Sequence, residues 1–226
     1  MKKILSICLV VFVVMSSTFV LAEESRNDLG MYVGIVGGMV FPNKISLTDK
    51  GPNNIPLQDL TMDNSAVLGA KIGYTPSFLN KILSVEIEYN HIFGPNVGNQ
   101  YWYTSSGYNF TVQANTSMDT IFMNFKVRYP TGRFHPYVGV APGWVWMKVS
   151  DLTQSVNVGG ARFTSTPLST SANNFAYQIL AGVEYDVVNN ISLDLGYKFL
   201  QGKPSWTEMD GTVSLNFVTL GLNYKF

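Results

Sequence analysis

The stretch Val218-Thr219-Leu220-Gly221-Leu222-Asn223-Tyr224-Lys225-Phe226 decides the fold class, because apolar residues occupy every second position in it. A period of two is the pattern of a β-strand with one apolar face and one polar face. A soluble β-sandwich strand can show the same alternation, but it does not usually stop on an aromatic residue with no tail. We therefore expect a strand whose apolar face meets lipid.

Seven further segments fit the same rhythm, five of them by clear alternation and two as glycine-rich runs. In chain order they are 32–41, 66–74, 83–90, 121–129, 137–147, 175–185 and 191–199. Short connections (75–81, 130–134 and 187–190) alternate with longer ones (42–64, 94–115, 150–171 and 201–210). Short periplasmic turns and long external loops are typical of outer-membrane barrels. The sequence therefore predicts an all-β fold, an eight-stranded antiparallel up-and-down transmembrane β-barrel with both termini on the periplasmic side.

The composition of the 226-residue chain agrees with a membrane barrel. Hydrophobic residues make up 46% and charged residues 13%, against about a quarter charged in a soluble domain. Such a chain has ample apolar surface to bury, so it is not disordered. The 20 glycines and 10 prolines argue against a helical bundle. The 15 basic and 15 acidic residues leave no basic excess for nucleic-acid phosphates, which excludes nucleic acid as a partner.

The first 22 residues have the pattern of a secretory signal peptide. Lys2 and Lys3 precede an apolar run from Ile4 to Leu21, and cleavage is expected after Ala22. The alternative is an uncleaved helical anchor, because about 18 apolar residues are close to the minimum for a span. We expect a signal peptide at 1–22 and a barrel domain at 23–226. The one cysteine, Cys8, falls in the signal peptide, so the barrel has no disulfide, thiolate nucleophile or cysteine metal site.

Aromatic residues recur at the expected ends of the lipid-facing strands. On each strand that descends to a short turn, a tyrosine stands at or near the last lipid-facing position, where its ring can stay apolar while its hydroxyl stays wet. The lower belt comprises Tyr74, Tyr129, Tyr185 and Tyr224, and the upper belt comprises Trp144, Trp146, Phe175 and Tyr177. The alternative is that these are ordinary core aromatics.

The opposite face of the strands carries charged residues that would point into the lumen. An eight-stranded barrel is only wide enough for side chains to fill, and buried charges must pair. A register reversed by one residue would place the same charges in lipid, at about 2–4 kcal/mol for each Lys or Arg near the midplane. We expect a lumen of ion pairs and trapped water instead of an open pore. The predicted network comprises Lys71, Glu86, Glu88, Lys126, Arg128, Glu184, Asp194 and Lys198, with Lys225 beside it.

The sequence resembles the small bacterial outer-membrane β-barrel proteins related to the transmembrane domain of outer membrane protein A. The resemblance rests on the signal peptide, the opening Tyr32–Gly38, the stretch Pro136–Gly143 and the ending Gly221–Phe226. It implies a location in the bacterial outer membrane and insertion by the barrel assembly machinery, with Tyr224 and Phe226 as the assembly signal. Outer membrane protein A carries a peptidoglycan-binding domain after its barrel, and we expect none after Phe226.

Catalytic, cofactor-binding and metal-binding residues are not predicted. The barrel acyl hydrolases carry a His-x-Ser pair in a late strand, and the sequence has no histidine after His135. His91 is expected near the external end of its strand and His135 near the periplasmic end of its own, so they would not share a site. Glu86 and Glu88 share a face as a catalytic carboxylate pair would, but the inward-pointing cations favour structural ion pairing.

The leading hypothesis for function is a non-enzymatic outer-membrane barrel with a largely plugged lumen. Its external loops would contact outer-membrane lipid and lipopolysaccharide, or a surface ligand, or would support envelope integrity. The aromatic run Tyr101-Trp102-Tyr103, with Tyr108 and Phe110, could mark a binding surface, but we favour the alternative that the strands extend and pair above the membrane. The rival hypothesis is a narrow porin or small-solute transporter, since glycine-rich inner faces could leave room for a path. A lipid-modifying enzyme is a more distant alternative.

Overall fold

A computed structural model describes residues 30–43, 46–49, 62–94, 97–103, 109–158, 161–166, 168–203 and 209–226. The expected signal peptide, residues 1–22, lies outside the described residues. Within the described part, no helix is both long enough and apolar enough to cross a membrane.

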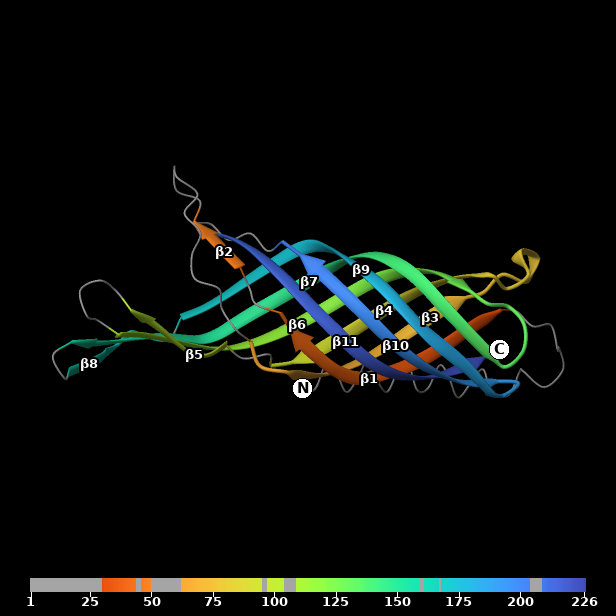
Figure 1. The fold of residues 1–226 in the computed structure, drawn as a ribbon, viewed down its shortest axis with the longest axis horizontal. Coiled ribbons are helices and arrows are strands. Elements are labelled where there is room, and N and C mark those ends of the chain that lie inside the picture. Colours follow the sequence, from red (N-terminus) through yellow and green to blue (C-terminus); the bar gives the residue numbers. More distant parts are fainter. Residues whose placement is uncertain are drawn as a thin grey trace.

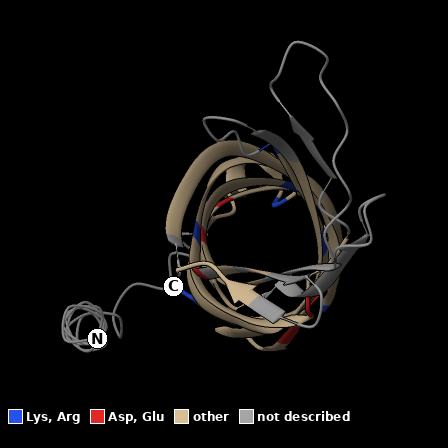
Figure 2. Ribbon diagram, turned by 90° about the vertical axis from the view of Figure 1, so that its left-hand side faces the viewer, with Lys and Arg blue, Asp and Glu red and all other residues tan. Residues whose placement is uncertain are grey.

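Eight antiparallel strands close into a barrel, seen from the side in Figure 1 and along its length in Figure 2. Each strand pairs with the next, and the last pairs back with the first, so the ring has no open edge. The predicted fold class is therefore confirmed. The strands are β1 (Met31–Pro42), β3 (Ser65–Tyr74), β4 (Leu83–Phe93), β6 (Asn109–Arg128), β7 (Phe134–Val158), β9 (Leu168–Val188), β10 (Ile191–Gly202) and β11 (Met209–Lys225).

The two faces of the strands are assigned as the alternation predicts. From Val218 to Asn223 in β11, exposed apolar residues alternate with buried small or polar ones. The tyrosines of the lower belt point outward, with Tyr74 42% and Tyr129 57% exposed, and the aromatics of the upper belt are also exposed. The apolar face therefore lies outside, where lipid solvates it, and the polar face lies inside.

The short connections lie at one end of the barrel and the long ones at the other. Residues 75–82 join β3 to β4 and contain a single 3₁₀ turn, η1 (Ser77–Leu79), while 129–133 and 189–190 join the other two pairs. Because short turns are periplasmic in outer-membrane barrels, this end is the periplasmic end.

The external connections contain more strand than the sequence predicts. Parts of the segments 94–115 and 150–171, expected as loops, continue as β6, β7 and β9, which have 20, 25 and 21 residues. Three short strands pair beside them: β2 (Ser46–Asp49) with β11, β5 (Val97–Tyr103) with β6, and β8 (Ala161–Thr164) with β7. Above the membrane water wets both faces of a strand, so a strand there no longer needs alternation, and the pattern misses it.

The aromatic run Tyr101-Trp102-Tyr103 belongs to β5 and pairs with β6 from Asn109 to Thr111. The aromatic run is therefore part of a strand that pairs with β6 on the external side, as the second interpretation of this run expects. Its side chains lie outside the described residues, as does all of Tyr108.

Candidate functional site

The lumen is the candidate site, because the inward-facing residues of all eight strands meet there. It has two parts, which we call the charged half and the apolar half. The charged half lies toward the short turns and contains the eight residues predicted as an ion-pair network. The apolar half lies toward the external loops. Figure 2 shows Lys and Arg (blue) and Asp and Glu (red) on the barrel strands.

Glu86 of β4 lies at the centre of the charged half. One of its oxygens, Oε2, is 2.7 Å from Lys126 Nζ and 3.4 Å from Lys71 Nζ. The Tyr32 hydroxyl donates a hydrogen bond to the same oxygen at 2.7 Å, and the Asn124 amide donates to Oε1 at 3.0 Å. This carboxylate thus accepts from four side chains, and its own side chain is 1% exposed.

Asp194 of β10 faces the same two lysines from the other side of the lumen. Lys71 pairs with its Oδ2, and Lys126 Nζ lies 3.9 Å from that oxygen. Tyr137 donates its hydroxyl hydrogen to Oδ1 at 2.7 Å, and its ring lies 4.5 Å below the Lys126 ammonium. Two carboxylates therefore share two lysines, which cross-links β3, β4, β6 and β10 through the middle of the barrel.

Glu88 forms the next layer toward the external side. It pairs with Lys198 of β10 and accepts hydrogen bonds from Asn90 at 2.8 Å and from Asn124 at 3.0 Å. Asn124 therefore bonds both Glu86 and Glu88. Its amide keeps the two neighbouring carboxylates at a fixed separation without adding charge.

A second cluster lies at the periplasmic rim. Glu184 Oε2 is 3.4 Å from Arg128 Nη1, and its Oε1 is 2.7 Å from Lys225 Nζ. Lys225 also pairs with Asp186, which lies 3.1 Å from His135 Nε2. This cluster connects β6, β7 and β9 to the last strand, β11.

The structure brings all eight residues of the predicted network into the charged half. Each has an opposite charge within 4.0 Å, and none of these side chains is more than 8% exposed. Four cations face four anions, so the interior carries no net charge. Opposite charges at such distances in a medium of low dielectric hold one another strongly, and removing one leaves its partner buried and unpaired.

Two tyrosines complete the charged half and are absent from the predicted network. Tyr32 lies over Gly73, where an added Cβ would fall 2.3 Å from the tyrosine ring, and Tyr137 lies over Gly182, where a Cβ would fall 2.6 Å from it. The glycines of the wall thus give room to rings that cross the lumen. Parity was the available signal: Tyr137 is out of phase with the outward-facing Trp144 and so faces inward.

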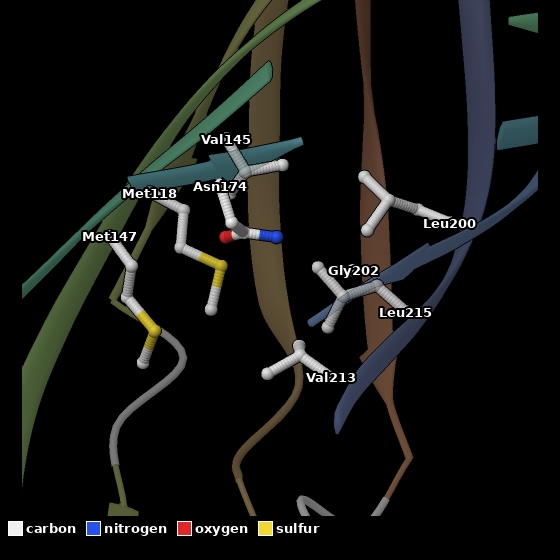
Figure 3. A pocket seen from close by; sticks show the side chains of 8 residues that line it. All are labelled: Met118, Val145, Met147, Asn174, Leu200, Gly202, Val213 and Leu215. Carbon is white, nitrogen blue, oxygen red and sulfur yellow. The ribbon is translucent and has the colours of Figure 1, made fainter. Parts of the chain in front are cut away.

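The apolar half is packed with hydrophobic side chains, and the sequence prediction missed it. Val40, Ile92, Leu200 and Leu215 are each no more than 1% exposed. Figure 3 shows the side chains around a small space in it, contributed by β6, β7, β9, β10 and β11. That space is a cavity of about 10 Å³, no more than a single water molecule requires.

The two histidines lie at opposite ends of the barrel. His91 Nδ1 is 2.8 Å from Asp119, which also accepts a hydrogen bond from Tyr89 at 2.6 Å, at the external end of β4. His135 lies at the periplasmic start of β7 and contacts Asp186. In the described part of the chain, no group of three His, Cys, Asp or Glu residues could hold a metal ion.

Comparison with known proteins places the chain among outer-membrane barrels. The family model described as "Outer membrane protein beta-barrel domain" matches residues 6–226. Outer membrane protein PagN of Salmonella typhimurium is 25% identical over 253 residues, which cover all of both chains.

Two solved structures resemble the fold at low sequence identity. Neisserial surface protein A is 18% identical with a TM-score of 0.50, over 87% of this chain and 97% of its own. The outer membrane protease OmpT of Escherichia coli is 9% identical with a TM-score of 0.52, over 91% of this chain and 99% of its own. At such identities the likeness extends to the fold alone.

Proposed function

The chain belongs to the outer-membrane β-barrel family and is located in the bacterial outer membrane, and from that premise we propose that it is a non-enzymatic barrel with a closed lumen. In this proposal the barrel wall anchors the protein, and its external strands and loops contact the cell surface or a ligand on it. Lipopolysaccharide and outer-membrane lipid surround the wall.

The observation that carries the proposal is the way the lumen is filled. The charged half is cross-linked by ion pairs from Lys71, Lys126 and Lys198 to carboxylates on other strands. Above it, Ile92, Leu200 and Leu215 point into the lumen with apolar side chains, each no more than 1% exposed. A permeating ion would have to displace paired charges and then cross an unhydrated zone, and both steps are costly.

The arrangement of titratable groups also favours a non-enzymatic role. Glu86 and Glu88 are saturated by lysines and amides, which leaves neither free to act as a general base. His91 and His135 each face an aspartate, at sites separated by the length of the barrel.

For assembly, we propose that the barrel assembly machinery recognises Tyr224 and Phe226. Their rings meet edge to face with centroids 5.2 Å apart. The Phe226 backbone N–H donates to the Met31 carbonyl at 3.0 Å, so the end of β11 lies beside the start of β1, where the ring closes.

Conductance measurements on the protein purified from outer membranes and inserted into planar lipid bilayers test the closed lumen. We expect no discrete current steps, because every lumen charge is paired. Glu86→Lys should create steps, since three cations would then repel one another in the charged half. Ile87→Lys, on the outward face of the same strand, serves as the control for an added charge and should conduct no current. Steps in the unaltered protein would favour the narrow porin or small-solute transporter instead.

A further inference from the structure

The three periplasmic turns of the barrel differ in size and chemistry. Residues 129–133 and 189–190 are brief, and 189–190 consists of two asparagines. Residues 75–82, which we call the β3–β4 turn, are longer and contain Phe78, Leu79 and Ile82. Figure 1 shows η1 of this turn standing out from the periplasmic end of the barrel wall.

Backbone hydrogen bonds fix the shape of the β3–β4 turn. The Asn80 N–H donates to the Ser77 carbonyl at 3.0 Å, the Lys81 N–H to the Pro76 carbonyl at 3.3 Å, and the Ile82 N–H to the Leu79 carbonyl at 3.1 Å. Asn80 and Lys81 adopt the left-handed conformation that ends the 3₁₀ turn, with φ of 52° and 59°. A turn with this many internal bonds presents its side chains in a defined direction.

The turn exposes three large apolar side chains beside the polar Ser77 and Asn80. Phe78 is 77% exposed, the largest value among the large hydrophobic residues in the described part of the chain, and Leu79 and Ile82 are 39% and 40% exposed. Thr75 and Pro76, at the base of the turn, are buried instead. The apolar side chains therefore point away from the barrel interior.

This exposed group continues the lipid-facing surface of the barrel. The turn begins directly after Tyr74, a member of the lower aromatic belt, and ends directly before Leu83, whose side chain faces lipid. Phe78 is four residues after Tyr74, so at the reach of an extended chain it lies within about 14 Å of that belt. The headgroup layer on one side of a bilayer is about 5–7 Å thick. Because Tyr74 and Leu83 hold both ends of the turn at the level of the belt, the turn lies beside the periplasmic headgroups.

We propose that the β3–β4 turn is a membrane foot, in which Phe78, Leu79 and Ile82 insert into the boundary between headgroups and acyl chains of the periplasmic leaflet. Apolar groups held at a rigid surface next to lipid gain the free energy of burial by entering it. The foot would fix the depth and tilt of the barrel from below. The occupant is phospholipid, because the residues that flank the turn, Tyr74 and Leu83, belong to the lipid-facing surface of the wall.

Spin labels at single cysteines test the proposal in protein purified from outer membranes and reconstituted in phospholipid vesicles. Cys8, the one native cysteine, lies in the expected signal peptide, and Cys8→Ser removes its thiol from any protein that retains that segment. Labels are then placed at Phe78→Cys, at Thr131→Cys on the tip of another periplasmic turn, and at Leu193→Cys on the lipid-facing wall. Collision with oxygen reports lipid, and collision with a water-soluble nickel chelate reports water.

We expect the oxygen-to-nickel collision ratio at position 78 to exceed that at 131 by about fivefold and to approach that at 193. A ratio at 78 equal to that at 131 would overturn the proposal and leave the apolar turn exposed to a periplasmic protein. If Phe78→Cys prevents folding, Leu79→Cys provides the same comparison, and the same two outcomes decide it.

Discussion

The charged half and the apolar half of the lumen fill the same barrel in different ways. In the charged half, wall glycines such as Gly73 and Gly182 leave space that Tyr32 and Tyr137 enter, and lysines reach across to carboxylates. In the apolar half, large side chains from opposite walls meet directly. The cross-section of an eight-stranded barrel is nearly constant. The two halves therefore fill an interior of the same width, one with ion pairs and tyrosine rings and the other with apolar side chains.

The two halves differ in what they contribute to the fold. Apolar packing tolerates exchanges of similar volume, because it is not directional. Hydrogen-bonded ion pairs tolerate few substitutions. Each buried charge has lost its hydration, and only the attraction of its partners offsets that cost. The charged half therefore fixes which strands face each other. The apolar half contributes packing that depends less on the identity of each residue.

The largest loss of stability is expected from a substitution at the centre of the charged half. Glu86→Gln removes one charge at constant shape and leaves Lys71 and Lys126 with Asp194 alone. We expect a loss of about 3–5 kcal/mol in the free energy of unfolding, measured by urea titration of protein folded in lipid vesicles. Ile87→Val, one residue away on the outward face, is the control. A loss below about 1 kcal/mol would mean that the pairs do not hold the lumen together.

A somewhat smaller effect is expected from the apolar half. Leu215→Ala opens a cavity among fully buried side chains and should cost about 2–5 kcal/mol in the same titration. Leu220→Ala, on the same strand but 58% exposed toward lipid, is the matched control. Lipid closes over the outward site, so its loss should be smaller. Equal losses at both sites would show that the apolar half is not tightly packed.

The smallest effect is expected for a single ion pair of the charged half, Lys198 with Glu88. Lys198→Met and Glu88→Gln each leave a partner unpaired, whereas the double variant removes both charges. The double-mutant cycle should give a coupling of about 0.5–3 kcal/mol, with the double variant less destabilised than the sum of the single ones. Additive losses would contradict a direct dependence of Glu88 on Lys198.

The wall of the barrel could be predicted from the sequence because lipid imposes alternation on it. The outward residues from Val218 to Leu222 and the tyrosines of the lower belt follow directly from the period of two. The inward position of the charges follows from the same parity, because the opposite face would place them in lipid.

The apolar half and the long external strands were not predictable from this pattern. At Phe122 the inward face of β6 is apolar like the outward Ile121 and Met123, so the alternation that is clear from Met123 to Tyr129 is absent at this position. Above the membrane both faces are wet, and β7 continues to Val158 without any periodic signal. A pattern that compares two faces is informative only where lipid and lumen make those faces different.

The length of β7 has a consequence for how the surface of this protein can change over evolution. Beyond Trp146 of the upper belt, β7 runs about 12 residues further, which raises its end about 30 Å above the membrane at the usual strand rise and tilt. It pairs with β6 over this distance, from Lys148 opposite Ser117 to Asn157 opposite Asn109, with one register shift between Gln113 and Asn115. Substitutions on such a hairpin alter what an antibody or a phage meets while leaving the backbone unchanged. Insertion of one residue within the regular pairing would turn every later side chain to the other face, so length changes are confined to the tips of the strands and to bulges such as the one between Val149 and Leu152.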